Sequence, residues 1–181
     1  MKYRLTDETK EWCGRTLHRI EALKSFGDMS AGEKGGWIEK EENLSQEGSC
    51  WVYDDAQVSG DAWVCGDARV YGNAQVYGDA WVYGDARVCG NAQVCGDAWV
   101  SGDARVKSCR DIFCITGLGS RYGTTTIYRN KDEGITVVCG CFLGTLEEFE
   151  AKVKKTHGDN LYGREYLKLI ELAKLHFEVE G

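Results

Sequence analysis

The stretch that decides the fold runs from Asp55 to Lys107 and reads DAQVSG DAWVCG DARVYG NAQVYG DAWVYG DARVCG NAQVCG DAWVSG DARVK, a period of six residues. Ala and Val stand two positions apart in every unit, so on an extended strand both side chains point to one face. Gly followed by Asp or Asn separates the units, and these residues tolerate the left-handed backbone of a sharp corner. The stretch therefore predicts short strands joined by corners, three to a coil.

A second period appears in the residue between Ala and Val, which repeats in every third unit. It runs Gln57, Trp63, Arg69, Gln75, Trp81, Arg87, Gln93, Trp99, Arg105. An eighteen-residue coil with three flat sides gives this order a spatial meaning. Each side then carries a ladder of Gln, Trp or Arg side chains that rises by about 4.7 Å per coil, the spacing between neighbouring strands.

The repeat, with a small Ala four positions after each Val, resembles that of the hexapeptide-repeat proteins. The resemblance implies a left-handed parallel β-helix, although general crossover rules favour the opposite hand. We therefore expect a mainly β protein: about three regular, three-sided coils with an N-terminal β cap and a small C-terminal α+β module.

Composition limits the classes of partner and compartment. The net charge is −7, and no run of Lys or Arg offers a local site for nucleic-acid phosphates, so binding to duplex nucleic acid is not expected. No segment has the apolar length of a membrane span, and the first residues lack a signal-peptide core, which predicts a bacterial host's cytoplasm. Nine cysteines, an odd number, fit reduced thiols in that compartment.

Residues 1–47 lie outside the regular repeats and are expected to form the N-terminal cap. Tyr3–Leu5 and Thr16–Leu23 alternate as strands do, and a Gly-rich connection follows. An open solenoid end needs a cover, because the first coil otherwise shows its core to water. We expect Trp37, Ile38 and Leu44 to plug the first turn, ahead of a repeat domain that spans residues 48–110.

Residues 111–181 are expected to form the α+β module. Strands are predicted at Ile112–Ile115, Thr124–Tyr128 and Gly134–Phe142. The run Thr145-Leu-Glu-Glu148 is a capping box that opens a helix closed near Gly158, and a second helix is predicted from about Leu161 to Phe177. This module either caps the coils or stands beside them as a partner-binding piece.

The whole chain resembles a group of prophage-encoded hexapeptide-repeat proteins of uncharacterised function. The matching runs are ALKSFG from Ala22, GGWIEKEENLS from Gly35, GSR from Gly119, TTTIYR from Thr124 and CGCFLGTLEEF from Cys139. This resemblance implies the fold and a phage origin, and it implies no activity.

Histidine bears on the question of catalysis. Hexapeptide-fold acyltransferases use a His base near a trimer interface, and a related carbonic anhydrase type binds zinc through three His. The coils of this chain contain no His, since His18, His157 and His176 lie outside them, and no loop is inserted between Asp55 and Lys107. The chain therefore leans towards a non-enzymatic function without cofactor, with an acyltransferase homologue or a structural phage protein as alternatives.

Two groups outside the coils are candidate sites. Four cysteines, Cys109, Cys114, Cys139 and Cys141, are a weak alternative for zinc, because Cys is also a common small buried residue. The loop around Ser120 and Arg121, with Arg129 further on, gathers donors suited to a phosphate. No predicted helix follows its glycines, so a plain turn is the simpler interpretation.

The aromatic ladder is the sharpest feature. Trp63, Trp81, Trp99 and Tyr83 would present several hundred Å² of apolar surface, given about 150–250 Å² for each Trp. A neighbouring subunit, the chain's own C-terminal helices or a stacked ligand could cover it. Guanidinium groups of Arg69, Arg87 and Arg105 are suitable counterparts, and a ring of three subunits would close such a contact.

These features predict a homotrimeric binding protein, and the resemblance to prophage-encoded proteins implies that a phage makes it for use in its host. The specific hypothesis is a counter-defence factor that captures a host immune protein or a nucleotide signal. Its expected binding residues are the Trp and Arg ladders, Tyr83, Ser120, Arg121 and Arg129.

Overall fold

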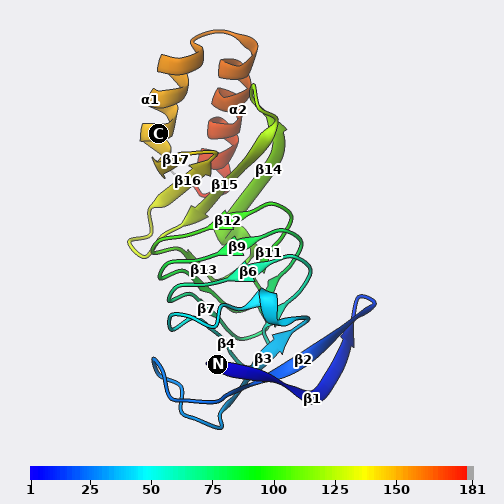
Figure 1. Ribbon diagram of the computed structural model, residues 1–181. Helices are drawn as coiled ribbons and strands as arrows, with labels where there is room; N and C mark the ends of the chain where they lie inside the picture. The colour runs from blue at the N-terminus through cyan, green and yellow to red at the C-terminus, as the bar shows by residue number, and fades with distance from the viewer. Residues whose placement is uncertain (179–181) are drawn as a thin grey trace.

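The structure is a computed structural model, and it describes residues 1–178. It is a parallel β-solenoid with a strand hairpin at one end and two helices at the other (Figure 1). The coil strands are two residues long: β4 (Trp51–Val52), β5 (Gln57–Val58), β6 (Trp63–Val64), β7 (Arg69–Val70), β8 (Gln75–Val76), β9 (Trp81–Val82), β10 (Arg87–Val88), β11 (Gln93–Val94), β12 (Trp99–Val100) and β13 (Arg105–Val106). The mainly β solenoid predicted from the repeat is confirmed.

Strand pairing follows the eighteen-residue period. Parallel pairing joins Trp63 to Trp81 and Trp81 to Trp99, and the Gln and Arg positions pair in the same way on the other two sides. The Ala and Val side chains of all units point inward and are at most 1% exposed. Because these side chains are small, three walls can meet around one continuous core.

Glycine at the corners permits the close approach of successive coils. Gly78 has a φ of 77°, and a Cβ at this position would lie 2.9 Å from the backbone nitrogen of Gly96 in the next coil. Both the positive φ and the short approach exclude an ordinary side chain there.

The N-terminal residues cover the first coil, as predicted, and also extend the solenoid: Tyr3 and Ile20 are fully buried in its core. The hairpin of β1 (Tyr3–Trp12) and β2 (Arg15–Ala22) leads to β3 (Lys34–Ile38), which pairs in parallel with β5 so that Trp37 matches Gln57. After a short 3-10 turn at Glu41–Asn43, Leu44 matches Val64, and β4 then pairs with β7. The solenoid therefore has about four turns, one more than the regular repeats predict.

The expected plug of Trp37, Ile38 and Leu44 is thus partly wrong. Ile38 and Leu44 join the solenoid core as rungs of an irregular first coil. Trp37 occupies an outward position, where the cationic ends of Lys10 and Arg19 lie 4.5 and 4.9 Å from its ring centroid. Their pairing with the next coil could not be predicted from the sequence, because these residues do not follow the six-residue spacing.

The C-terminal module contains a four-stranded antiparallel sheet and two helices. Its strands are β14 (Ile112–Leu118), β15 (Gly123–Arg129), β16 (Ile135–Cys139) and β17 (Phe142–Thr145), and a 3-10 turn at Cys109–Asp111 precedes them. The single strand expected at Gly134–Phe142 is two strands, because the chain reverses at Gly140. Helix α1 (Leu146–His157) begins at the predicted capping box of Thr145 and Glu148, and α2 (Leu161–His176) follows. Among residues 1–178, no helix has the length and apolar character needed to cross a membrane.

Strand β15 closes the last coil. In earlier coils the N–H of Trp81 and that of Tyr83 donate to carbonyls one coil further on. Strand β12 is the last strand on the Trp side, so no carbonyl of a further coil is present there. Hydroxyls of β15 take that place: Trp99 N–H donates to Thr126 (3.1 Å), and Ser101 N–H donates to Tyr128 (3.3 Å). The Tyr128 ring is fully buried in the solenoid core. Of the two expected placements of the module, the structure shows the cap.

The opposite face of β15 belongs to a second core. Ile127 packs there with apolar side chains of α1 and α2, including Phe149 and Ile170. The sheet thus has coils on one face and helices on the other, which creates the space described next.

Candidate functional site

The Trp ladder forms as predicted, and its rings do not stack uniformly. The rings of Trp63 and Trp81 meet edge to face, with centroids 5.1 Å apart and planes at 82°. Those of Trp81 and Trp99 are parallel, with centroids 5.3 Å apart and planes at 11°. Trp81 and Trp99 are 38% and 40% exposed, whereas Trp63 and Tyr83 are more deeply buried. The chain's own helices therefore leave the outer edge of this ladder uncovered.

The Arg ladder occupies a different side of the prism and engages acidic groups of its own chain. Arg105 donates to the Asp85 carboxylate at 2.9 Å, and Arg69 contacts that of Asp28 at 2.9 Å. The hydrogen bond from Arg105 holds the pKa of Asp85 below its ordinary value. Arg87, between them, has a buried Nε that finds no hydrogen-bond partner among residues 1–178. These contacts indicate a structural role for the ladder.

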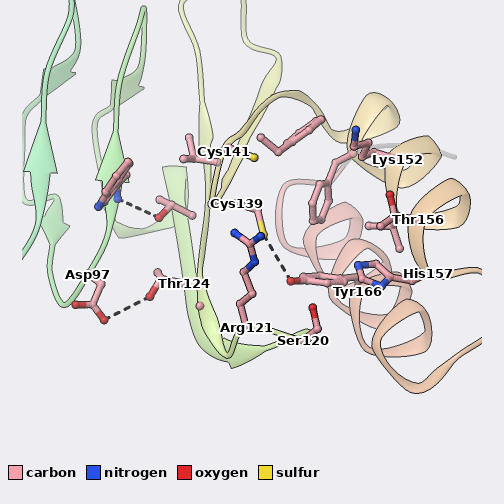
Figure 2. A pocket seen from close by; sticks show the side chains of 18 residues that line it. Asp97, Ser120, Arg121, Thr124, Cys139, Cys141, Lys152, Thr156, His157 and Tyr166 are labelled. Atoms are coloured by element: carbon pink, nitrogen blue, oxygen red, sulfur yellow. Dashed lines mark hydrogen bonds between the residues drawn. The ribbon is translucent and has the colours of Figure 1, made fainter.

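A cavity of about 650 Å³ lies between the last coil and the two-helix module (Figure 2). It combines aromatic and aliphatic walls with hydroxyls and charged groups. Its lining residues come from four parts of the chain: Asp97 and Trp99 from the last coil; Ser120, Arg121, Gly123, Thr124 and Thr126 around the start of β15; Val138, Cys139, Gly140, Cys141 and Phe142 around the end of β16; and Phe149, Lys152, Val153, Thr156, His157 and Tyr166 from the helices. Three of the predicted binding residues, Trp99, Ser120 and Arg121, meet here.

The loop that carries Ser120 and Arg121 is anchored to α2. The N–H of Gly119 donates to the Glu165 carboxylate at 3.1 Å, and Gly119 packs so closely on the Tyr166 phenol that a Cβ would collide with it. Because Glu165 accepts this N–H, the Gly119 N–H is engaged within the chain and does not serve as a phosphate donor. The loop's role is to hold the Arg121 side chain at the cavity, where Figure 2 shows it between Thr124 and Tyr166.

A polar cluster lines the helix side of the cavity. Thr125 donates its hydroxyl to the Cys139 sulfur at 3.2 Å, and that thiol lies 3.7 Å from the Tyr166 oxygen. The His157 ring packs on Tyr166 with centroids 5.8 Å apart. Burial, and then the contact with Cys139, raise the pKa of Tyr166 well above its ordinary value. Tyr166 is therefore a neutral phenol at physiological pH, suited to hydrogen bonding and not to proton abstraction.

Arg129 lies away from this cavity. Its guanidinium is 5.5 Å from the Phe177 ring centroid and 3.6 Å from Asp111, and it donates to the Phe177 carbonyl at 2.9 Å. These contacts attach the end of α2 to the sheet, so Arg129 serves the module's packing and is not part of the predicted ligand loop.

The structure also separates the four cysteines of the zinc alternative. Cys114 pairs with Thr126 and Cys139 with Thr125. Because neighbouring residues of β15 point to opposite faces, these two thiols lie on opposite sides of the sheet. Cys109 contacts the Asn91 carbonyl. Within residues 1–178, no three His, Cys, Asp or Glu side chains gather as a metal site, and all nine thiols are free.

The helix residues of the cavity were missed at the level of sequence. Phe149, Lys152, Val153, Thr156 and His157 recur at the spacing of one helix face and could have been recognised as one surface. Nothing in that spacing shows that the face lies opposite Trp99, because the two are brought together only by the sheet between them.

Comparison with known proteins finds similarity in the coils. The family described as YdcK beta solenoid repeat matches residues 62–78, 68–84, 74–90 and 80–96. The "Uncharacterized acetyltransferase YdcK" of Escherichia coli (strain K12) is 37% identical over 78 residues, which cover 38% of this chain. The chain spans about a quarter (24%) of the length of that relative. These similarities support a repeat β-solenoid and leave the activity of the whole chain open.

Proposed function

We propose that this chain is a non-enzymatic binding protein that captures a small anionic molecule in the cavity between its last coil and its C-terminal helices. The observation that carries the proposal is the cavity itself: about 650 Å³, walled by Trp99, Phe149 and Tyr166 and bordered by Arg121 and Lys152. Ligand sites are typically concave, mainly apolar spaces of this size with a few placed polar groups.

The proposed setting is phage counter-defence in the cytoplasm of a bacterial host. Support comes from the resemblance to prophage-encoded proteins and from a cavity with an aromatic wall and cationic groups, which suits a nucleotide signal. Capture of a host immune protein is the alternative within this setting, and the exposed edge of the Trp ladder is the surface that would meet it.

The test is native mass spectrometry of the protein purified from its own host. We expect one retained small molecule per chain, which is lost after Phe149→Trp fills the cavity. Phage that lack the gene should also replicate poorly on defended hosts and normally on undefended ones. Protein that carries no small molecule, together with normal growth of the deletion phage on defended hosts, would contradict the proposal.

Acyl transfer is the second candidate, and two observations favour it. The Escherichia coli relative is named an acetyltransferase, and the cavity contains His157 beside Tyr166 and the Cys139 thiol. The coils, from Asp55 to Lys107, offer no His. Turnover of acetyl-CoA discriminates between the two functions: an acetyltransferase should release free CoA when an amine or hydroxyl acceptor is present, and a binding protein should not.

A further inference from the structure

The stack of Trp rings ends at the cavity. One face of Trp99 is covered by the parallel ring of Trp81. The next position in the eighteen-residue period is Gly117, which lies on β14 outside the coils, so no fourth Trp follows. Trp99 instead lines the cavity. The ladder thus presents an indole at the point where a further flat ring would continue the stack.

Charges of opposite sign lie at the two sides of this cavity. Asp97, which contacts the Thr124 hydroxyl at 3.4 Å, lies on the coil side next to Trp99. Arg121 lies on the loop that is anchored to α2, and Lys152 lies on α1. Within residues 1–178, neither Arg121 nor Lys152 pairs with a carboxylate, in contrast to Arg69 and Arg105 of the ladder.

We infer that the ligand has a planar nitrogen-containing ring that stacks on Trp99 as the next rung of the ladder, and a phosphate that binds Arg121 and Lys152. This inference rests on the proposed function and specifies its ligand class as a nucleoside monophosphate or a larger nucleotide that contains one. The Asp97 carboxylate repels the phosphate from the coil side and accepts a hydrogen bond from an amino group on the ring. The ring therefore faces the coils, and the phosphate faces the helices.

Three probes separate the two ends of such a ligand: AMP, adenosine and ribose 5-phosphate. We expect AMP to bind most tightly by isothermal titration calorimetry and to quench the indole fluorescence. Trp99→Leu should weaken AMP binding on the order of ten-fold or more, since stacking of a base on an aromatic side chain is of that strength. Trp99→Phe keeps a flat ring and should restore most of the affinity.

The phosphate end has its own prediction and controls. Arg121→Met should weaken AMP binding, and Arg121→Met combined with Lys152→Met should reduce AMP affinity to that of adenosine; both should leave adenosine binding unchanged. Matched controls come from the N-terminal hairpin, where Trp12→Leu and Arg4→Met change residues remote from the cavity. Both should bind AMP as the unmodified protein does.

The outcomes distinguish this inference from the function on which it rests. Equal AMP affinity in Trp99→Leu and the unmodified protein would overturn the stacking geometry, and the capture function would stand if native mass spectrometry still shows a retained molecule. Failure of AMP to bind the unmodified protein would overturn the ligand class. Absence of any retained molecule in protein from the host, together with normal growth of the deletion phage on defended hosts, would overturn the function as well.

Discussion

Tyr128 shows how one residue ends a solenoid. Its hydroxyl accepts from the Ser101 N–H, a group that a further coil would otherwise satisfy, and donates to the Ser101 carbonyl (3.2 Å). The run TTTIY alternates as a strand does, but alternation alone does not show which face meets the coils. The sequence therefore predicted the strand but did not show that it caps this end of the coils.

Removal of that hydroxyl should destabilise the protein. Tyr128→Phe keeps the buried ring and leaves the Ser101 N–H without its acceptor, at a cost of about 1–3 kcal/mol in the free energy of unfolding. Urea denaturation measures this cost. The control is Tyr122→Phe, whose ring is 70% exposed and which should unfold as the unmodified protein does. Equal stability of the two variants would show that Tyr128 does not close the coil.

Cys50 predicts a dependence of stability on pH. It occupies an Ala position of the core, where burial raises the pKa of its thiol and the nearby Lys2 amine only partly offsets the effect. The folded chain keeps the proton at a pH where the unfolded chain loses it. The stabilisation is complete below the ordinary thiol pKa of about 8.5 and is lost as pH rises above it.

The variant Cys50→Ala places the residue of the regular repeats at this position. We expect the unmodified protein to lose more stability than this variant between pH 7.5 and 9.5. Parallel pH profiles of the two proteins in urea titrations would contradict the assignment.

The coil is the element that explains most of the molecule. Its strands are only two residues long, and each is stabilised by its place in a sheet that runs through successive coils. Position in the six-residue unit predicted burial of Ala and Val correctly, and the eighteen-residue period predicted the pairing of Trp63, Trp81 and Trp99. Those patterns are regular because identical units face identical neighbours.

The corner glycines allow a test of the stacking of coils. Gly78→Ala and Gly96→Ala both place a Cβ on a backbone with positive φ, at about 1–2 kcal/mol. Only at Gly78 does that Cβ meet the next coil, whereas nothing lies within 4 Å of it at Gly96. Gly78→Ala should therefore lose about 1 kcal/mol more in the free energy of unfolding, and equal losses would argue against the close approach of these coils.

At the scale of the whole molecule, the cavity is the feature that sequence reasoning could not predict. It joins Trp99, Arg121, Phe149 and Tyr166, which come from the coils, a loop and two helices. No local period connects these residues, because the sheet between coils and helices determines how they meet. The sequence identified the ladders and the Ser120–Arg121 loop as separate candidates. Of the ladder residues, the fold brings only Trp99 to the same cavity as this loop.

We propose that the protein assembles as a homotrimer, which light scattering tests directly. The exposed edges of Trp81 and Trp99 form an apolar surface for which a neighbouring copy is the proposed cover. Light scattering should give a mass three times the chain's 20.2 kDa. Trp81→Lys should reduce the mass to that of one chain. A mass of one chain for the unmodified protein would contradict the trimer.

The central claim is that the cavity at the end of the Trp ladder is where this protein captures its ligand. A crystal structure of the protein with AMP tests it most directly. The account predicts electron density for a ring parallel to the Trp99 indole and for a phosphate at Arg121. Density for AMP on any other surface, with the cavity empty, would contradict it.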